Sequence, residues 1–406
     1  MDRVILHCDC NAYFASVETI KRPELARVPM AVCGDPKSRH GVILAKNELA
    51  KAYGVTTAET VWQAQRKCPR LVLVVPHHDE YQRYCRKINA IYEQYTDQVE
   101  AFSIDESWLD VTGSTHLFGS GKEIADTLRK RVREELGLTI SVGVSYNKVF
   151  AKMGSDYKKP DATTEITREN YQSLLWPLPA RDLLFVGKSS WDILNRANIE
   201  TIGDIARTGR ERMRQLMGGR GGDAIWEYAM GLDESPVRHT GDTDPAKSVG
   251  CGITFSRNLC GWHDVTAGLT MLCDQVATRL RQQGMYAKTV QVQIRDPQFV
   301  TINRQRTGQN ATNTTKEIFD IAFDIVKSSW SEYAPIRMLT VTATGLTNEQ
   351  SVQIGLFEDL SKREKNEKLD AAVDRIRQRF GSSAVTYGTQ VKSDLLHSDD
   401  EDEKQI

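Results

Sequence analysis

The sequence predicts an α+β protein with several domains. Its 406 residues exceed the length that one hydrophobic core usually organises, which favours two to four domains. Short apolar runs alternate with amphipathic helical segments up to about residue 165, and this alternation returns after residue 246. The region between them has a helical pattern with short glycine-containing turns. Two α+β sheet domains separated by a helical region account for this order.

The first sheet domain is predicted from residues 1–22 and 78–165. An apolar strand at 4–10 leads into a helical segment. Residues 23–77 interrupt the domain with the short strands and helices of a smaller unit. The domain then continues with a long helix, a strand, a second helix, a second strand and a basic segment, namely DEYQRYCRKINAIYEQYTDQ, VEAFSIDESWLDV, GKEIADTLRKRVREELG, TISVGVS and NKVFAKMGSDYKKP.

The second half of the chain is predicted to hold the helical region, 166–235, a linker, 236–246, and the second sheet domain, 247–345. The linker is rich in the proline, glycine and aspartate that favour turns. After a short segment, 346–358, residues 359–387 contain a helix that starts at a Ser361/Glu364 capping box. Its apolar residues follow helical spacing: Leu369, Ala372, Val373, Ile376 and Phe380. The acidic tail, 388–406, is predicted to be disordered.

The composition is that of an ordinary soluble protein, with 40% hydrophobic and 26% charged residues. There is no apolar run of roughly 18 residues to span a bilayer and no signal-peptide core, so we expect a cytoplasmic protein without a membrane partner. The eight cysteines lack CxxC pairs or regular spacing, which favours reduced, structural thiols. The net charge of −1 conceals locally basic segments, which either attract a polyanion or are ordinary solvated helix faces.

Three acidic residues stand within apolar strand patterns. We interpret residues 99–111 as one mostly buried strand that carries Asp105 and Glu106, and Asp9 lies in the first strand. A buried, unpaired carboxylate costs several kcal/mol, so something must compensate these charges. Two Mg²⁺ ions about 4 Å apart would do so and would support phosphoryl or nucleotidyl transfer. Without metal, we expect the strand to be strained and sensitive to pH.

Other interpretations of these acids remain open at this point. Asp105 would then cap a turn, Glu106 would pair with an arginine, and Asp9 would end its strand. Acids about a hundred residues apart in the chain need not meet. The basic segment favours the metal interpretation, because its lysines would neutralise a polyphosphate: Lys148, Lys152 and Lys159.

Four segments, in order, resemble the signature segments of the Y-family lesion-bypass DNA polymerases. They are DCNAYFASVE, SIDESWLDVTG, SVGVSYNKVFAKMGSDYKKP and KSVGCGITFSRN. The resemblance extends from residue 1 to about 380 and is closest to the bacterial polymerase IV and polymerase V branches. It implies a right-hand polymerase with a palm (1–22 and 78–165), small fingers (23–77), a helical thumb (166–235) and an α+β little finger (247–345). The implied activity is template-directed translesion DNA synthesis from dNTPs on primer-template DNA, without proofreading.

The resemblance also implies roles for residues of the active site. Asp9, Asp105 and Glu106 would bind two Mg²⁺, with the backbone carbonyl of Cys10 as a further ligand, Asp105 bridging and Glu106 nearer the primer hydroxyl. Phe14 would be the steric gate that excludes a ribose hydroxyl, unless it is a plain core residue. Residues expected to contact the nucleotide are Tyr13, Lys51 and Lys159. Many relatives have a tyrosine and an arginine where this chain has Glu48 and Lys51.

DNA contacts are expected in the thumb and the little finger. Gly187, Lys188 and Gly203 correspond to a helix-hairpin-helix, although Leu184 and Phe185 replace its usual Pro-Gly. An ordinary helical hairpin is the alternative. In the little finger, Lys247 and Ser248 begin the first strand, and Arg304 and Arg306 alternate along another, so that both face one side. Cys251 stands where relatives often have an arginine.

Gln353, Leu356 and Phe357 resemble the Q-x-x-L-F peptide that docks on the bacterial sliding clamp, although such short patterns also arise by chance. We expect a monomer. Two other functions compete with the polymerase. One is a clamp-bound DNA-binding protein that has lost efficient synthesis, which Glu48 favours. The other is a metal-dependent phosphatase with a D-x-D nucleophile, which Asn11 disfavours because it replaces the second acid.

Overall fold

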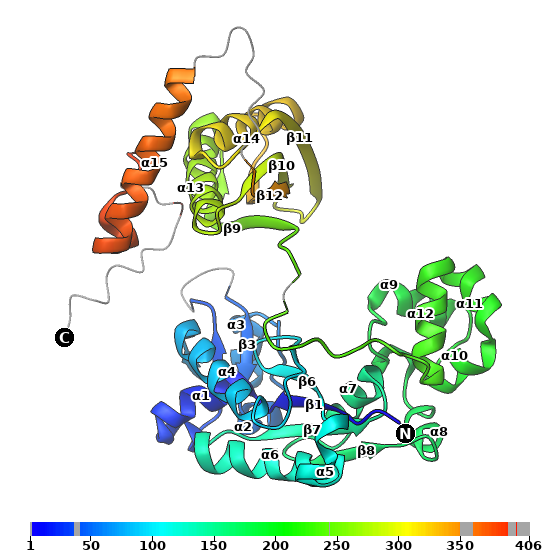
Figure 1. The fold of residues 1–406 in the computed structure, drawn as a ribbon. Helices are drawn as coiled ribbons and strands as arrows, with labels where there is room; N and C mark the ends of the chain where they lie inside the picture. The colour runs from blue at the N-terminus through cyan, green and yellow to red at the C-terminus, as the bar shows by residue number, and fades with distance from the viewer. Residues whose placement is uncertain (1, 36–40, 243, 350–359, 389–394, 396–406) are drawn as a thin grey trace. The chain divides into compact units, whose positions relative to one another are not determined.

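The computed structural model describes residues 2–35, 41–242, 244–349, 360–388 and 395. Their contacts divide into two compact units, one before and one after residue 243, which are described separately (Figure 1). The chain is a mixed α/β protein, as the sequence predicts, while the finer division into palm, fingers, thumb and little finger stays a prediction. None of the helices in the described ranges has the length and apolar character needed to cross a membrane.

The first unit is built on a five-stranded sheet with the order β5-β6-β1-β7-β8. The strands are β1 (Ile5–Cys10), β5 (Val99–Ala101), β6 (Glu106–Asp110), β7 (Ile140–Ser145) and β8 (Thr163–Ile166). β1 lies in the middle and pairs antiparallel with both β6 and β7. The helices of this part are α1 (Tyr13–Lys21), α4 (His78–Tyr92), α5 (Thr115–Phe118), α6 (Gly121–Leu136) and α7 (Lys148–Tyr157).

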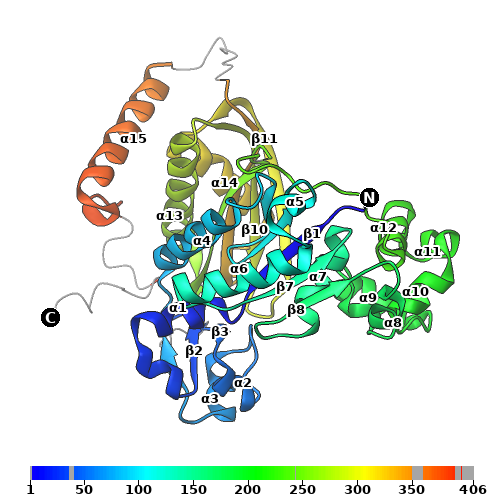
Figure 2. The same ribbon diagram turned by 60° about the horizontal axis from the view of Figure 1, so that its bottom comes forward.

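Alternating residues of β1 serve two different surfaces. Leu6, Cys8 and Cys10 belong to the core that contains the buried residues of α4 and α6, which lie side by side in Figures 1 and 2. The intervening residues Ile5, His7 and Asp9 point to the opposite face, toward α7. α7 packs close to this face because a Cβ at Gly143 of β7 would overlap the backbone of α7. The central strand is therefore apolar on one side and carries polar side chains on the other.

Residues 99–111 do not form the single strand that the sequence predicts. The chain folds back as a hairpin in which β5 pairs with β6, and the turn contains Phe102 to Asp105. The amides of Phe102 and Ser103 both donate to the carbonyl of Glu106, which closes this turn. Phe102 is exposed, so this apolar residue does not belong to a hydrophobic core. Asp105 thus lies in a turn, and Glu106 begins a strand.

Residues 23–77 form a small three-stranded sheet with the order β3-β2-β4 and a core of their own. The elements are the 3₁₀ helix η1 (Pro23–Arg27), β2 (Met30–Cys33), β3 (Ile43–Lys46), α2 (Glu48–Ala52), α3 (Val61–Lys67) and β4 (Val72–Val74). The rest of the first unit is helical around another apolar core. Its helices are α8 (Tyr171–Leu175), α9 (Lys188–Arg196), α10 (Ile202–Thr208), α11 (Arg210–Met217) and α12 (Gly219–Met230).

The second unit contains an antiparallel sheet with the order β11-β10-β12-β9. Its strands are β9 (Ser248–Leu259), β10 (Tyr286–Arg295), β11 (Thr301–Thr312) and β12 (Ile336–Thr347). Two helices, α13 (Gly261–Gln282) and α14 (Thr315–Ser329), share one core with the alternating apolar residues of the strands. The other residues of β10 and β12 point to a face that carries mostly threonine and glutamine side chains, called the open face below.

The last helix, α15 (Leu360–Phe380), lies within the predicted segment 359–387 and ends before Gly381, whose φ is 93°. It contacts α13 through ion pairs of Arg281 with Asp370 and Asp374. The apolar side that defined the helix in the sequence does not dock, since Leu369, Ile376 and Phe380 are exposed. Three parts of the C-terminal prediction lie outside the described side chains, namely the capping residue Ser361, residues 389–394 and residues 396–406.

Candidate active site

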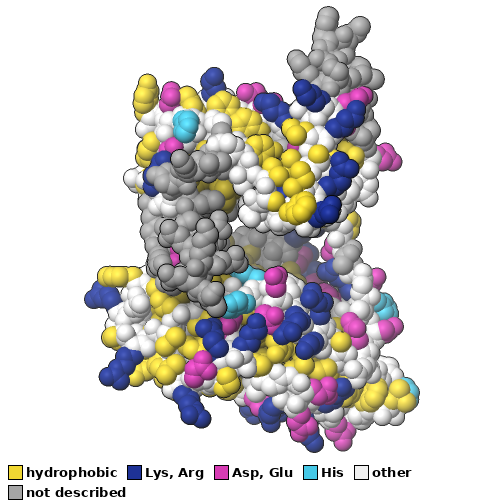
Figure 3. Space-filling model, turned by 90° about the vertical axis from the view of Figure 1, so that its left-hand side faces the viewer, with side chains coloured by type: hydrophobic (Ala, Val, Ile, Leu, Met, Phe, Trp, Pro, Cys, Tyr) yellow, Lys and Arg dark blue, Asp and Glu magenta, His cyan; other side chains and the backbone are white. Residues whose placement is uncertain are grey.

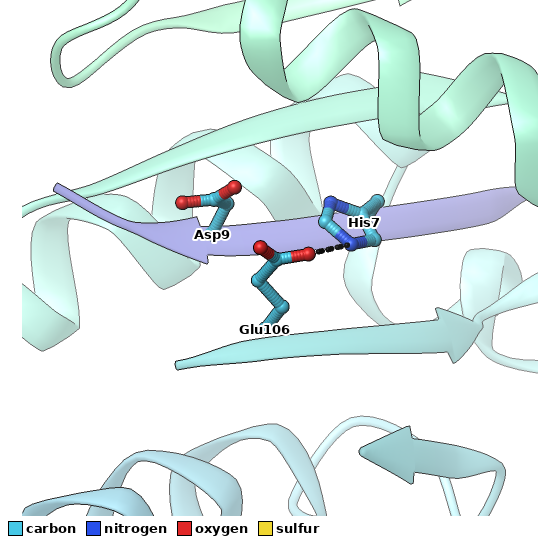
Figure 4. Close-up of side chains that lie close together, drawn as sticks. All are labelled: His7, Asp9 and Glu106. Carbon is cyan, nitrogen blue, oxygen red and sulfur yellow. Dashed lines mark ion pairs between the residues drawn. The ribbon is translucent and has the colours of Figure 1, made fainter. Parts of the chain in front are cut away.

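The three predicted acids meet at one end of the central strands of the first unit. Asp9 is paired in register with Glu106 on the neighbouring strand β6. Asp105 directly precedes Glu106, and its carbonyl accepts a hydrogen bond of 3.0 Å from the amide of Cys10. The hairpin and β1 therefore bring together residues that lie far apart in the sequence. Figure 4 shows the Asp9 and Glu106 carboxylates above the sheet, with His7 beside them.

Two lysines of the α7 region compensate part of this negative charge. Lys152 Nζ lies 3.0 Å from Asp9 Oδ2 and 2.8 Å from Glu106 Oε2. Lys159 Nζ lies 2.7 Å from Asp9 Oδ2 and 2.8 Å from Asp156 Oδ1. Burial disfavours the charged form of both lysines, but the surrounding carboxylates outweigh it and raise the pKa of each. The chain thus supplies cations of its own to the acids.

Asp105 and Glu106 differ in their electrostatic surroundings. Burial raises the pKa of Asp105, and the charges of Asp9 and Glu106 raise it further, against a 2.6 Å hydrogen bond from Ser103. Burial would also raise the pKa of Glu106, but the nearby His7 imidazole and Lys152 ammonium group lower it to about 2. The expected pH sensitivity is therefore centred on Asp105. The expected strain of the strand stays a prediction, and Glu106 Oε2 has His7 and Lys152 close to it.

His7 is a member of this cluster that the sequence analysis missed. Its side chain is fully buried, and Nε2 lies 3.3 Å from Glu106 Oε2. On the other side of the ring, Nδ1 lies 2.9 Å from Ser155 Oγ in α7. Burial lowers the pKa of the imidazole. The available signal was a polar residue two positions before Asp9 in an apolar strand, on the same side of that strand.

The donor set fits hard divalent cations. Asp9, Asp105 and Glu106 offer carboxylate oxygens, which Mg²⁺ prefers over nitrogen or sulfur. Single ligand atoms of His7, Asp9 and Glu106 lie within 4.8 Å of one another, close enough to surround one ion. Asp105 lies outside that tight group and faces Ser103. These observations are compatible with metal at the site and do not identify the ion or the number of ions.

A cavity of about 350 Å³ opens beside the acids. Its lining includes Tyr13, Lys46 and Lys51, together with Asp9, Cys10, Asp105, Glu106, Lys152 and Lys159. Glu48 also lines it and forms an exposed ion pair of 3.4 Å with Lys51, so that lysine partly neutralises the negative charge of Glu48. Lys46 was missed, because a single lysine at a strand end carries no spacing signal.

The segment between β1 and α1 shapes the mouth of this cavity. Ala12 adopts a left-handed conformation with φ 47°, which is unusual for a residue with a side chain. Tyr13 is buried and donates a 2.6 Å hydrogen bond to the carbonyl of Tyr81. The ring of Phe14 stacks on that of Tyr81, with centroids 4.1 Å apart and planes 12° apart. Phe14 is thus fixed in place and only partly buried.

The predicted DNA-binding residues of the helical region differ in their exposure and in whether their backbone amide is already hydrogen-bonded. Gly187 is the N-cap of α9 and Lys188 is its first residue, and both are exposed. Gly203 lies inside α10, is buried, and donates its amide hydrogen to the carbonyl of Trp176 at 3.0 Å. That hydrogen bond argues against Gly203 as a phosphate donor.

Arg304 and Arg306 share one side of β11, as predicted. They lie opposite Val292 and Val290, which belong to the core under the helices. Both arginines therefore lie on the helix-covered side of this edge strand, and Arg306 pairs with Asp324 of α14 at 3.0 Å. The alternating residues Asn303 and Gln305 belong to the open face.

Lys247 and Ser248 are exposed at the start of β9, where Ser248 lies opposite Thr344 of the open face. Cys251 lies on the helical side, and its thiol donates to Gln275 at 2.8 Å. Its departure from the arginine of relatives therefore does not change the open face. Gln353, Leu356 and Phe357, predicted to bind the clamp, lie outside the described residues.

Most basic side chains of α6 form ion pairs with acidic side chains of the protein. Lys122 pairs with Asp126, Arg131 with Glu135, and Arg129 and Arg133 with Asp161. On the face shown in Figure 3, basic and acidic side chains are interspersed over the lower body. For this helix, the solvated-face interpretation describes the structure better than a polyanion site.

Comparisons with known proteins agree over nearly the whole chain. The impB/mucB/samB family model matches residues 8–156, and the model of that family's C-terminal domain matches residues 246–356. A protein named DNA polymerase IV from Acetivibrio thermocellus is 47% identical, over 96% of this chain and 97% of the relative. Another of that name, from Clostridium kluyveri, is 34% identical over 97% of this chain and 99% of the relative.

Among solved structures, a Y-family DNA polymerase chimera matches with a TM-score of 0.75 at 20% identity, covering 84% of this chain and 98% of that one. This match supports the fold, and the assignment to a family rests on the more similar relatives. The chain therefore belongs to the Y family of translesion DNA polymerases, in the group named DNA polymerase IV.

Proposed function

We propose that this polymerase joins dNTPs to a primer 3′-hydroxyl with two Mg²⁺ ions held by Asp9, Asp105 and Glu106, and by the Cys10 carbonyl. The observation that carries the proposal is the convergence of three carboxylates from β1 and the β5–β6 hairpin on one cavity. When bound, the ions would lower the pKa of the primer hydroxyl and neutralise charge on the triphosphate.

The lysine ammonium groups that line the cavity would hold the triphosphate. Lys159 and Lys152 already bind carboxylates there, and a triphosphate would offer them new anionic partners. Lys51 lies on the opposite, α2 side of the lining, with Lys46 at the end of β3. Lysine at position 51 gives a point charge without the bidentate fork of an arginine. Four lysines around one cavity support recognition of a polyphosphate.

Tyr13 and Phe14 would lie next to the sugar of the incoming nucleotide. The stacking of Phe14 on Tyr81 supports a gate function, because a ring fixed by a neighbour cannot turn aside for an added hydroxyl. The hydrogen bond from Tyr13 to Tyr81 fixes the same turn.

Primer-template DNA would be held in two places, each within one of the units. The exposed start of α9, at Gly187 and Lys188, offers backbone N–H groups and one positive charge to a phosphate. In the second unit, the open face and the start of β9 offer hydroxyl and amide groups, with Lys247 at its margin. Hydroxyl and amide side chains suit contacts to phosphates and sugars.

Primer extension on a defined template in Mg²⁺ tests the polymerase mechanism. We expect the wild type to extend the primer, and Asp105→Ala and Glu106→Ala to lose extension while still binding the DNA. Lys188→Ala serves as the matched control that weakens DNA binding without touching the acids. Extension by Asp105→Ala or Glu106→Ala at the wild-type rate would refute the assigned roles, and no extension by the wild type would favour the DNA-binding alternative.

We further propose that Gln353, Leu356 and Phe357 dock on the sliding clamp, that the enzyme is a cytoplasmic monomer, and that it lacks proofreading. The Q-x-x-L-F pattern, in a family whose members copy DNA, supports the clamp proposal. Size-exclusion chromatography with purified clamp would show a complex with the wild type and none with Gln353→Ala/Phe357→Ala.

A further inference from the structure

We propose that His7 is a positioning residue that holds the Glu106 carboxylate in the orientation needed for metal binding. The inference rests on the proposed metal site. Although a ring nitrogen of His7 lies within the 4.8 Å group of possible ligand atoms, Mg²⁺ prefers oxygen to nitrogen, so the proposal assigns His7 to Glu106 and not to the ion. The position of the imidazole between β6 and α7 suggests this role.

The His7 ring is fixed on three sides. It is fully buried and makes an edge contact with Trp108, with ring centroids 5.2 Å apart. Nδ1 lies 2.9 Å from Ser155 Oγ, and Nε2 lies 3.3 Å from Glu106 Oε2 (Figure 4). Both nitrogens therefore meet side chains at the site. A histidine that only filled the core would more simply bond to the backbone.

These contacts close a loop between three elements. Ser155 Oγ lies 2.7 Å from the carbonyl of Lys152 in α7, and Lys152 Nζ lies 2.8 Å from the same Glu106 Oε2 that faces His7. Glu106, His7, Ser155 and Lys152 thus form a ring of contacts from β6 through β1 to α7.

The proton arrangement follows from the acceptors. Glu106 Oε2 accepts only, so its contact with Nε2 is attractive when Nε2 carries the proton. Nδ1 then accepts the single hydroxyl proton of Ser155, which in this tautomer turns from the Lys152 carbonyl, 2.7 Å from Oγ, to the imidazole. The opposite tautomer would set a nitrogen lone pair against a carboxylate oxygen. Glu106 Oε2 and His7 Nε2 are both buried, and neither has a partner with hydrogen-bond geometry among the described residues, so their 3.3 Å approach is a close electrostatic contact. His7 and Lys152 therefore anchor this inner oxygen, which leaves Oε1 for a ligand in the cavity.

The test separates the Nε2 contact from packing. In His7→Gln, the side-chain amide can donate from near the Nε2 position. In His7→Asn, the shorter amide reaches toward Ser155 but not Glu106. His7→Leu removes both contacts and keeps an apolar side chain. Ser145→Ala is the matched control, because Ser145 is a buried serine of the same sheet that bonds to the Ile166 carbonyl and touches no acid.

Mn²⁺ binding to the full chain, followed by electron paramagnetic resonance without DNA or nucleotide, gives a readout independent of catalysis. Changes to residues that orient metal ligands commonly weaken metal affinity by about 10- to 100-fold. We expect a loss in this range for His7→Leu and His7→Asn, a recovery toward wild type for His7→Gln, and no change for Ser145→Ala. In primer extension, the same two variants should need more Mg²⁺ without a matching rise in the KM for dNTP.

Wild-type Mn²⁺ affinity in folded His7→Leu, or equal weakening in His7→Gln and His7→Leu, would overturn the proposal. If His7→Leu fails to fold, Ser155→Ala decides, because it keeps the ring and removes its Nδ1 partner. Weaker Mn²⁺ binding in that variant is expected, and unchanged binding would refute the proposal. Failure of the metal site itself would look different: Asp9→Ala and Asp105→Ala would then bind Mn²⁺ as well as the wild type.

Discussion

At the scale of single residues, Asp105 and Glu106 are neighbours in the chain with opposite electrostatic surroundings. Glu106 faces His7 and Lys152, which hold its pKa at about 2. Asp105 faces Ser103 and two other acids, and burial raises its pKa. One carboxylate is therefore stabilised by the fold itself, while none of the described residues forms an ion pair with the other.

Removing the Asp105 charge should stabilise the metal-free protein. Because the folded-state pKa of Asp105 is raised, the folded protein binds this proton more tightly than the unfolded chain, and stability falls as the pH rises through the folded-state pKa. We expect Asp105→Asn to have a higher Tm than the wild type at pH 7 in EDTA. The difference should vanish at a pH below the unfolded-state pKa. Added Mg²⁺ should raise the Tm of the wild type more than that of Asp105→Asn. A variant less stable than the wild type at pH 7 would contradict the assigned surroundings.

The ring of Phe14 should decide between deoxyribose and ribose. Phe14→Ala removes the side chain that stacks on Tyr81 and opens space beside the sugar. We expect ribonucleotide incorporation, measured as kcat/KM relative to dNTP, to rise by at least about tenfold. Tyr81→Leu, which removes the support and keeps the gate, should give a smaller rise. Unchanged discrimination in Phe14→Ala would mean that this ring is only a core residue.

At the scale of elements, α15 is held to its unit by charges rather than by its apolar side. Arg281 of α13 is largely buried and contacts Asp370 at 3.0 Å and Asp374 at 2.6 Å. Asp370 also accepts the amide hydrogen of Thr315 at the start of α14. Arg377 of α15 pairs with Asp274 of α13 at 2.8 Å. Such partly buried pairs are costly to break from one side, because the remaining charge stays in place.

Arg281→Met should release α15. The substitution leaves the carboxylates of Asp370 and Asp374 without their main cation, which typically costs about 3 to 5 kcal/mol when a buried pair is broken. We expect the amides of α15 to lose hydrogen-exchange protection by a corresponding factor. Arg281→Met/Asp370→Asn/Asp374→Asn should recover part of the protection. Protection of α15 equal to that of the wild type would show that the apolar contacts suffice.

At the scale of the whole molecule, the net charge of −1 gives little information about DNA binding. Many cations are already paired, as in α6, and the sum also counts the acidic residues of the tail, 388–406. The affinity for DNA depends instead on how many lysine and arginine side chains contact phosphates and thereby release the counterions of the DNA.

Lys188 and Arg306 should differ in this respect. Binding to primer-template duplex should weaken with salt, and Lys188→Ala should reduce the slope of log K against log salt by about 1. Arg306→Ala should have a smaller effect, because Arg306 is engaged by Asp324 and lies on the helical side of its sheet. Fluorescence anisotropy over a salt series would measure both. A larger effect for Arg306 would indicate that DNA displaces Asp324.

The sequence predicted the fold class and the order of most elements, because apolar periodicity records which residues are buried. It did not predict the hairpin at Phe102–Asp105, since Phe102 is an apolar residue in an exposed turn. For α15, helical spacing identified the helix but could not reveal the ion pairs that hold it to α13. Asp9 and Glu106 become partners only through strand register, which residue spacing cannot reveal. His7 was missed because its spacing of two residues from Asp9 places both on one side of the strand but does not reveal the contact with Glu106 of the neighbouring strand.

The lysines that lie on the acids have a consequence for how the ligands bind. A cation that enters alone must compete with Lys152 and Lys159 for Asp9, and part of its binding free energy is lost in displacing them. A triphosphate that enters at the same time gives the released ammonium groups new partners. Metal and nucleotide should therefore bind with positive coupling, and by linkage each should raise the affinity of the other by the same factor.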